Sequence, residues 1–421
     1  MDALHGTLAG KPSLIDDLPA ERHREGEQEG QREPTQEPDL SSRPGPARPA
    51  TLAVVIVSYN VRELLGRCLE SVFASAARCP DWLRVDVLVV DNASQDGSPQ
   101  MVAQEFPQVR LMALDENLGF AGANNRALRA LGFGEASPLP QPLTWLSSSP
   151  LHEWRGEGVA SSGSRGRGEV RKGEAPDLVL LLNPDTELVD DALGRMAAFL
   201  RDHPRAGACG AHLRYGDGRF QHGAFRFPGL MQVALDLLPW DQAPGLRRLL
   251  PRLLDSRLNG RYPRRLWEGQ EPFPVDFVLG AALMVRAEAM HQVGLLDEGY
   301  FMYCEEMDWC LRLGEAGWTV HALPGARVIH HEGQSSRQIP WTSFRRLWRS
   351  RFRFYAKHRK RYPRGFVWGL RGLVRTGLAL RGWLARRRFA QGKISGQELA
   401  EELAAYEAVG RMAGSFRDEE M

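Results

Sequence analysis

The chain has 421 residues, of which 43% are hydrophobic and 25% are charged, and its formal net charge at pH 7 is +2. This length allows one large domain or two ordinary ones, with ample apolar material for a core. The five cysteines show no Cys-x-x-Cys pair, so we expect reduced thiols in a cytoplasmic protein rather than a metal cluster. We expect neither a signal peptide nor a spanning helix, because no N-terminal apolar segment and no uncharged apolar run of about 18 residues is present.

The N-terminal part changes character sharply at Thr51. Residues 1–50 are rich in Glu, Arg, Gln, Pro and Gly, and we expect a disordered extension because they cannot bury enough apolar surface to offset ordering entropy. Beyond them the apolar spacing predicts strands over 52–58, 85–90 and 109–113, alternating with helices over 64–73 and 99–106. This alternation predicts an α/β fold, with a doubly wound, mostly parallel sheet that carries helices on both faces.

A glycine-rich loop, Asn117–Arg126, is predicted to enter a helix that ends near Leu131. Its backbone N–H groups at the helix start would suit an anionic phosphate, although a simple turn and helix cap explains the pattern equally well. Residues 134–175 are rich in Ser, Gly, Pro and Arg without any period. A structureless segment of that length inside a compact domain is best interpreted as a disordered surface insertion.

The run Leu178–Leu182 predicts a short strand buried on both faces. Pro184 cannot continue a central ladder, so the strand ends there and Asp185 is held just past its carboxyl edge. That edge is where ligands bind in open α/β sheets, and an acid there could hold Mg²⁺ or Mn²⁺ against a diphosphate. A proline turn with surface acids is the alternative.

The second half of the chain is less regular, and residues 229–272 cannot be assigned. The other predicted elements are a helix over 190–203, a strand over 207–213, a hairpin turn over 215–218, a strand over 275–285, helices over 287–293 and 301–313, and a strand over 326–329. The predicted helix that begins near Phe301 carries the acids Glu305, Glu306 and Asp308 in its first turn. Such acids stabilise a helix N-terminus through the dipole, but desolvated carboxylates also have raised pKa values that suit a general base.

The C-terminal tail, residues 341–421, differs in composition. Between Gly333 and Gln397 there is no acidic residue, while 18 Lys or Arg occur and aromatic residues are interleaved with them. On a helical wheel Arg364, Arg371, Arg375 and Arg386 share one side. The pattern favours a basic amphipathic helical tail that associates with a membrane surface, with packing on the rest of the protein or nucleic-acid binding as alternatives.

Six motifs occur in a characteristic order: Val57–Asn60, Asp91–Ser98, Asn117–Asn125, Leu182–Glu187, Phe301–Trp309 and His330–Ser336. Together they resemble inverting glycosyltransferases of family 2, most of all the rhamnosyltransferase-type members with a GT-A fold. The resemblance covers about residues 51–340 without the insertion. It implies one catalytic domain over 51–340, preceded by the extension 1–50 and followed by the tail 341–421.

The resemblance also implies roles for particular residues. Glu306 stands where the family usually has the aspartate that acts as general base, and Asp308 and Glu305 are the next candidates. Asp185 would bind the divalent cation, Mg²⁺ or Mn²⁺, and His330 would complete the metal site. The residues implied to bind the nucleotide sugar are Ser58, Tyr59, Asn60, Asp91, Asn92, Asn117, Gly119, Asn124 and Asn183.

The resemblance implies an enzyme that moves rhamnose or another hexose from a nucleoside-diphosphate sugar to a hydroxyl of a glycan or lipid-linked acceptor, for cell-surface polysaccharide. We expect it to be peripheral at the inner face of the cell membrane, held through residues 341–390, with nucleic acid an unlikely partner. A GT-A-like protein without activity that binds membranes or nucleic acid is the alternative. A nucleotidyltransferase is less favoured, because the sequence lacks a glycine-rich pyrophosphorylase signature near the first strand.

Overall fold

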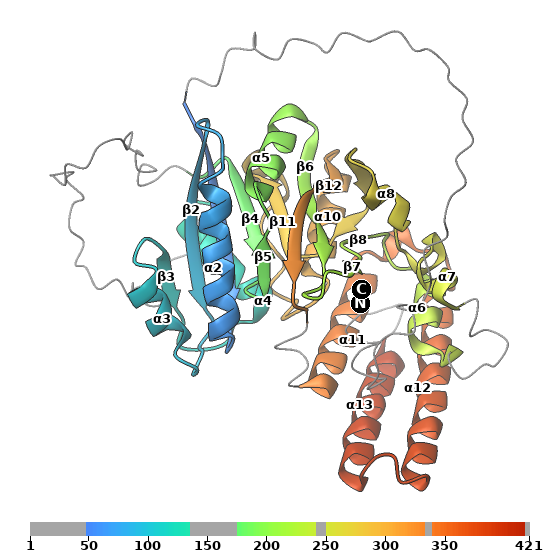
Figure 1. The fold of residues 1–421 in the computed structure, drawn as a ribbon. Coiled ribbons are helices and arrows are strands. Elements are labelled where there is room, and N and C mark those ends of the chain that lie inside the picture. The colour runs from blue at the N-terminus through green and yellow to red at the C-terminus, as the bar shows by residue number, and fades with distance from the viewer. Residues whose placement is uncertain (1–47, 135–174, 241–249, 333–338, 417–421) are drawn as a thin grey trace, which may run out of the picture.

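The computed structural model describes residues 48–134, 175–240, 250–332 and 339–416 (Figure 1). The extension predicted over 1–50 and the insertion predicted over 134–175 lie, except for their ends, outside the described residues. Within them the chain forms a large mixed sheet with helices on both faces and three helices after it. The predicted α/β class and the helical tail are therefore confirmed.

The first half of the sheet is parallel. Its strands are β1 (Ala50–Ser58), β2 (Leu83–Asp91), β3 (Arg110–Ala113) and β4 (Leu178–Leu182), in the order β3-β2-β1-β4. All three pairings are parallel, and Ser58 at the end of β1 lies opposite Asp91 at the end of β2. Because β2 and β4 flank β1 on opposite sides, the connections diverge at β1, which is the position where doubly wound sheets open a ligand crevice.

The second half of the sheet is mixed. β11 (Ala282–Arg286) runs antiparallel to β4, and β6 (Ala206–Arg214), β12 (Thr319–His330) and β5 (Thr186–Leu188) follow it in that order. Two short strands attach at the side, β7 (Phe220–Gln221) to β6 and β9 (Phe273–Val275) to β12. The turn predicted over 215–218 connects β6 to β7, with Gly218 N donating to Tyr215 O.

The single strand predicted over 275–285 is wrong. β9 ends at Val275, β10 (Phe277–Val278) pairs with β8 (Ala224–Phe225) in a separate two-stranded sheet, and β11 begins only at Ala282. The chain leaves the large sheet after β9, forms β10 in the two-stranded sheet, and returns to the large sheet at β11. Gly280 lies in that crossing, close to the side chain of Glu306.

Alternation along the strands divides the core in two. In β1, Leu52, Val54 and Ile56 belong to one buried cluster, and Val55 and Val57 belong to the other. The helices over the first cluster are α2 (Arg62–Ala76), α3 (Ser98–Glu105) and α5 (Ala192–Asp202). The helices over the second cluster are α4 (Gly119–Ala130), α9 (Ala287–Val293) and α10 (Glu305–Glu315).

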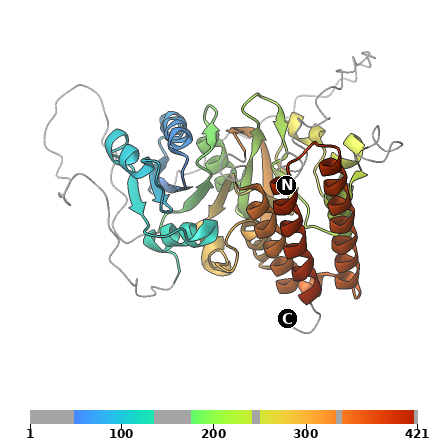
Figure 2. The same ribbon diagram turned by 90° about the horizontal axis from the view of Figure 1, so that it is seen from below.

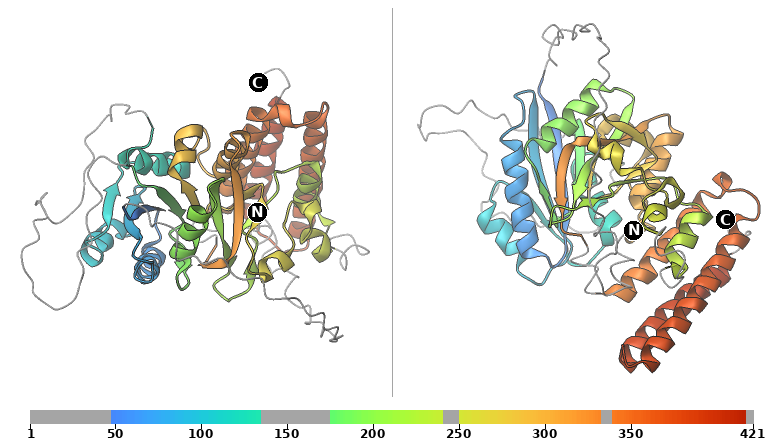
Figure 3. Two further views of the ribbon diagram at one scale, coloured as in Figure 1. Left: turned by 90° about the horizontal axis from the view of Figure 1, so that it is seen from above. Right: turned by 45° about the vertical axis from the view of Figure 1, so that its right-hand side comes forward.

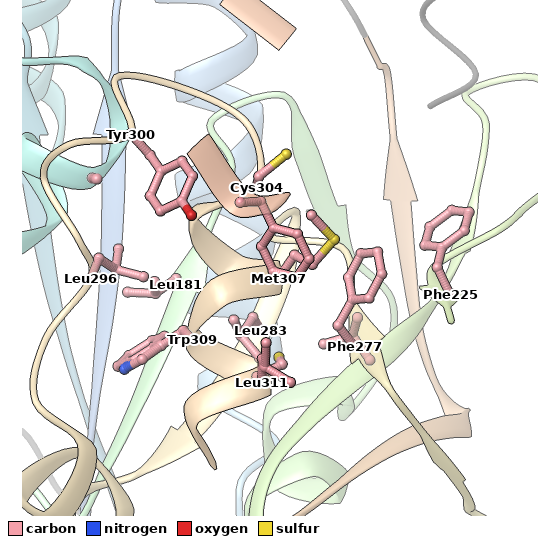
Figure 4. Packing of buried hydrophobic residues seen from close by; sticks show 14 of the residues in the cluster. Leu181, Phe225, Phe277, Leu283, Leu296, Tyr300, Cys304, Met307, Trp309 and Leu311 are labelled. Atoms are coloured by element: carbon pink, nitrogen blue, oxygen red, sulfur yellow. The ribbon is translucent and has the colours of Figure 1, made fainter. Parts of the chain in front are cut away.

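Helix α10 is the centre of the second cluster (Figure 4). Met307 and Leu311 pack toward Leu283 of β11, and Trp309 is buried with its Nε1 donating to Gly294 O at 2.9 Å. These contacts hold the helix firmly against the sheet. The acids of its first turn are thereby fixed near the carboxyl edge of the parallel strands.

The unassigned residues 229–272 contain short helices. They are α6 (Leu230–Leu237), α7 (Leu250–Leu254), the 3₁₀ helix η3 (Arg257–Asn259) and α8 (Arg264–Glu268). The C-terminal part forms α11 (Pro340–Lys357), η4 (Arg359–Arg361), α12 (Phe366–Ala390) and α13 (Gly396–Ser415). Of all the helices that the structure describes, none combines the length and the apolarity needed to cross a bilayer.

The C-terminal helices α11, α12 and α13 lie side by side at one end of the sheet (Figure 2). Helix α11 is part of the second core cluster, since Phe344, Trp348 and Phe354 are buried in it. Helix α12 packs between α6 and α13, where Gly377 faces Leu237 and Gly382 faces Tyr406. The right-hand view of Figure 3 shows the C-terminal helices projecting from the body.

Candidate active site

Polar groups gather where β1 and β2 end. Ser58 and Asp91 lie opposite each other in register and are buried. Among the described residues, neither Ser58 Oγ nor Asp91 Oδ1 has a hydrogen-bond partner. Burial raises the pKa of Asp91, although hydrogen bonds from Ser94 partly offset this. Because orphaned buried polar atoms are costly, these two atoms fit a polar ligand better than an empty interior.

The loops after β1 and β2 are bound to each other. Asn60, in the left-handed region at φ 52°, donates its backbone N–H to Ser94 Oγ at 3.0 Å and accepts from Gln95 N at its side-chain oxygen. Tyr59, which lies between Ser58 and Asn60 in the sequence, is 41% exposed. The predicted residues Ser58, Tyr59, Asn60 and Asp91 are thus brought together on one edge.

Asn92 and Asn117 shape the next loop. Asn92 Nδ2 donates to Asn117 Oδ1 at 3.0 Å and to Gly119 O at 3.2 Å, and its Oδ1 accepts from Leu118 N at 2.8 Å. Gly119 N donates to Asn117 Oδ1, and Phe120 N donates to Phe301 O. These three backbone N–H groups therefore have protein acceptors. This corrects the expectation that the loop leaves them free for phosphate: the loop connects β2 to the segment before α10.

Gly119 is required at its position. Its φ is +73°, and a Cβ there would collide with the carbonyl oxygen of Phe301. Asn124 is buried but donates only within its own helix, to Phe120 O at 2.9 Å. The neighbouring Asn125, which the sequence analysis did not single out, exchanges hydrogen bonds with the backbone of Leu296. It therefore joins α4 to the segment before α10.

The turn after β4 is built by its backbone. Asn183 N donates to Ala281 O at 2.9 Å, and Asn183 O accepts from Thr186 Oγ1 at 2.7 Å. Asp185 follows with a side chain that is 13% exposed. Since Ala281 is adjacent to Gly280, this turn lies next to the crossing segment that contacts Glu306.

Asp185 faces His330 across 3.4 Å, from Asp185 Oδ1 to His330 Nε2. Burial by itself would raise the pKa of Asp185, but the nearby His330 outweighs it and the pKa is lowered. The backbone also joins the two elements, because His331 N donates to Asp185 O. The 145-residue separation of this pair in sequence is closed by the pairing of β5 with β12.

Gln221 and Glu332 orient His330. Gln221 Nε2 donates to Glu332 Oε2 at 3.0 Å, which turns Gln221 Oε1 toward His330 Nδ1 at 3.2 Å. An amide oxygen can only accept, so His330 donates from Nδ1, and its other ring nitrogen, Nε2, is the one directed at Asp185. Two electron-rich atoms that face each other in this way are suited to share a cation, and such outer hydrogen bonds are typical of metal-binding histidines.

The two ligands alone do not complete a coordination sphere. Within the described ranges no group of three or more His, Cys, Asp or Glu side chains is placed to hold a metal. A site of one carboxylate and one imidazole nevertheless fits Mg²⁺ or Mn²⁺, because these ions commonly take their remaining ligands from substrate phosphates and water. Residues 333–336 of the last motif lie outside the described residues.

The first turn of α10 carries the candidate base. Tyr303 and Cys304 precede it in the left-handed region, at φ 72° and 69°. Such strained pairs of non-glycine residues concentrate at functional sites. Glu306 is half-buried beside Gly280, while Glu305 is buried, and one carboxylate oxygen of each lacks a protein partner among the described residues. Burial raises the pKa of both, and the charge of Glu306 raises that of Glu305 further.

Asp308 does not fit the role of base. Its side chain is 0% exposed, with Oδ1 2.8 Å from both His358 Nε2 and Lys357 Nζ, and Oδ2 accepting from Arg312 Nε at 2.9 Å. A carboxylate with this many cationic partners is a weak proton acceptor. The prediction of Asp308 as a candidate base is thus corrected: it anchors α10 to α11, a contact that no local sequence signal reveals.

The chain is similar in sequence to known proteins. The profile described as "Glycosyl transferase family 2" matches residues 53–131. An "N-acetylglucosaminyl-diphospho-decaprenol L-rhamnosyltransferase" of Mycobacterium tuberculosis is 30% identical over 354 residues, which are 82% of this chain and 97% of that protein. "Rhamnosyltransferase WbbL" of Escherichia coli is 38% identical over 92 residues, 22% of this chain and 35% of that protein.

Among solved structures, a mannosyltransferase from Pyrobaculum calidifontis, determined in complex with GDP-Man and Mn²⁺, has a TM-score of 0.47 at 14% identity. The likeness covers 90% of this chain and 91% of that one.

Proposed function

The chain belongs to glycosyl transferase family 2, and from that premise we propose that it transfers rhamnose, or a related hexose, from a nucleoside-diphosphate sugar to a hydroxyl group of a lipid-linked glycan. The catalytic domain would comprise residues 51–340. Its nucleoside site would be the edge formed by Ser58, Asn60 and Asp91, where the orphaned Ser58 Oγ and Asp91 Oδ1 support a polar ligand. Asn92 and Asn117 would act indirectly, by holding the loop that closes this edge.

Asp185 and His330 would hold a divalent cation, Mg²⁺ or Mn²⁺. When bound, such an ion neutralises the charge that develops on a leaving diphosphate. The protein would contribute an ionised carboxylate, which the lowered pKa of Asp185 supports, and a ring nitrogen of His330 that the contact of Gln221 with Nδ1 directs at this carboxylate. Asn183 would position the turn through its backbone.

Glu306 would remove the proton from the acceptor hydroxyl. Of the three acids in the first turn of α10, Glu306 is not buried as Glu305 is, and within the described residues it is not ion-paired as Asp308 is. A carboxylate with a raised pKa is a better general base near neutral pH. The deprotonated hydroxyl attacks the anomeric carbon from the face opposite the diphosphate, so the configuration inverts without a covalent sugar–enzyme intermediate.

The acceptor class is proposed from the mycobacterial relative, whose name specifies a decaprenol diphosphate that carries N-acetylglucosamine. We infer a similar polyprenyl diphosphate glycan for this chain, used in cell-surface polysaccharide synthesis at the inner membrane face. The membrane contact would lie within residues 341–390.

The observation that supports this proposal most is that the segment before β11 contacts both the turn that carries Asp185 and the candidate base Glu306. Ala281 O accepts from Asn183 N, and Glu306 packs on the adjacent Gly280. The test is calorimetric binding of nucleoside-diphosphate sugars in the presence of Mn²⁺, Mg²⁺ or EDTA, followed by product analysis with a soluble glycan acceptor. Metal-dependent binding that is lost in Asp185→Ala is expected. A folded protein that binds no donor in any condition would overturn the proposal.

A further inference from the structure

Helix α12 exposes large apolar side chains although its other side is fully packed. Trp368 is 69% exposed, Trp383 57%, Phe389 46% and Leu380 41%. On the side opposite Trp368 and Trp383, Leu370, Val374 and Leu378 are buried in the second core cluster. The helix therefore has an inner face that holds it to the protein and an outer face that no described part of the chain covers.

The outer face is a continuous strip. At 100° per residue, Trp368, Arg375, Trp383 and Arg386 fall within an arc of about 80°. Trp368 and Trp383 are separated by about 22 Å along the helix axis, at a rise of 1.5 Å per residue. Side chains arranged in this way can reach one flat surface at the same time. We call the strip formed by Trp368, Arg375, Trp383 and Arg386 the outer face of α12.

The charge of this face is uniformly positive. Arg375, Arg386 and Arg387 are exposed, and α12 contains no acidic residue. Two further contacts place cations over the exposed rings: the guanidinium of Arg371 lies 5.6 Å from the Trp368 ring, and that of Arg387 lies 5.7 Å from the Trp383 ring.

The acids of the neighbouring helix α13 leave this charge largely uncancelled. Glu402 accepts from Arg388 and Tyr406, Glu398 accepts from Ser395 N, and Glu407 pairs with Arg411 of its own helix. Glu401 accepts from Gln397, also within α13. The outer face of α12 is therefore complementary to a negatively charged surface.

We propose that the outer face of α12 lies on the surface of an anionic lipid bilayer. Tryptophan rings favour the boundary between acyl chains and headgroups, and arginines bind lipid phosphates there. A symmetric pair of α12 helices is disfavoured, since arginine would oppose arginine. This inference rests on the proposed function, because the contact would bring the enzyme to a lipid-linked acceptor that is held in the bilayer.

The position of α12 agrees with this role. β1 enters the sheet at the top of Figure 1 and runs downward, so the carboxyl edge with the candidate site is the lower edge, and α12 and α13 project below it. The inference also narrows the proposed contact within residues 341–390. The aromatic residues of α11 are buried in the core or, for Trp341, half-buried against it, and Arg364 precedes the first residue of α12, so we place the membrane contact on α12.

The test uses the full chain and sedimentation with vesicles, without donor or acceptor. Vesicles of phosphatidylcholine alone are compared with vesicles that also contain phosphatidylglycerol. The double variant Trp368→Ser/Trp383→Ser and the charge variant Arg375→Glu/Arg386→Glu are compared with Leu258→Ser, which removes a side chain that is also exposed, at 55%, but lies outside α12. Thermal unfolding by circular dichroism verifies that every variant is folded.

We expect wild type and Leu258→Ser to bind only the anionic vesicles, with a blue shift of tryptophan fluorescence. Both α12 variants should bind at least tenfold more weakly. Equal binding by folded α12 variants, or no binding by wild type, would refute the inference. So would concentration-dependent dimerisation that the variants abolish, or a preference for single-stranded nucleic acid over vesicles. Transfer to a soluble acceptor should be unchanged in both variants, which separates a failure of this inference from a failure of the proposed function.

Discussion

His358, the residue directly after α11, lies with its Nε2 2.8 Å from Asp308 Oδ1 of α10, two residues from the candidate base Glu306. Lys357 adds a second contact to the same oxygen, and it also bonds Asp297 in the segment before α10. The first C-terminal helix is thus a support for the candidate site. Its residues 340–357 belong to the same hydrophobic core as the sheet.

Replacing Asp308 should destabilise the fold. Asp308→Asn removes the carboxylate partner of Arg312 and one of the two carboxylate partners of Lys357 at a buried position, which costs about 3 kcal/mol of unfolding free energy at pH 7. Burial opposes ionisation, but His358, Lys357 and Arg312 together lower the pKa of Asp308 to about 2. Because the folded pKa is below the unfolded value, the stabilisation is complete above about pH 4 and is lost as the pH falls toward 2.

Urea unfolding between pH 7 and pH 2 measures the difference in unfolding free energy between wild type and Asp308→Asn. This difference should become smaller below about pH 4. Asp81→Asn is the control, since Asp81 is exposed. Equal stability of wild type and Asp308→Asn at pH 7 would show that the network contributes nothing.

Glu306→Gln should reduce kcat by at least about 100-fold, because a general base contributes roughly that factor or more. Binding of the donor should change little. Since the pKa of Glu306 is raised, the acid limb of the wild-type pH profile should lie above the ordinary glutamate range, with activity falling as the base is protonated. The measurement is the initial rate of transfer against pH.

Two variants separate Glu306 from its neighbour. Glu306→Asp keeps a carboxylate and should retain measurable transfer, whereas Glu305→Gln should lower the rate far less than Glu306→Gln. A result in which Glu305→Gln is inactive and Glu306→Gln is active would reassign the base.

Gln221→Ala should weaken binding of Mn²⁺ by about 10- to 100-fold, the usual effect of losing a partner that orients a metal-binding histidine. The loss arises because His330 Nδ1 no longer has the acceptor that directs its Nε2 toward Asp185. Calorimetric titration with Mn²⁺ and a nucleoside diphosphate gives the affinity without any need for catalysis. Gln100→Ala, at an exposed position in α3, should bind as wild type does. Unchanged affinity in Gln221→Ala would exclude this orienting role.

Two glycine substitutions should have opposite effects. Gly119→Ala places a Cβ against Phe301 O at a positive φ, so we expect a loss of at least about 1–2 kcal/mol and weaker donor binding. Gly66→Ala, inside α2 with open space around the added Cβ, should stabilise the protein by up to about 1 kcal/mol. Thermal melts of both variants provide the comparison. A neutral Gly119→Ala variant would mean that the loop is free to shift.

Elements with a strong local signal could be predicted from the sequence. The strand Leu178–Leu182 and the helix Ala287–Val293 agree residue for residue, because an uninterrupted apolar run before Pro184 and a glycine after Val293 mark their ends. The strand predicted over 275–285 failed because one half pairs with β8 and the other with β4. Those partners are distant in the chain, and an apolar run has the same appearance in either sheet.

For the candidate site, the sequence by itself determined which residue types stand at the ends of the strands, and the ordered motifs indicated the family. Only the tertiary structure decided what each side chain contacts. In the folded chain Asp185 lies next to His330, and backbone N–H groups of the Asn117 loop donate to acceptors within the protein. Asp308 is ion-paired, whereas one carboxylate oxygen of Glu306 has no partner among the described residues. The physical reason is that hydrogen bonds, burial and ion pairs are formed between segments far apart in the chain, and these contacts set whether a carboxylate is available for chemistry.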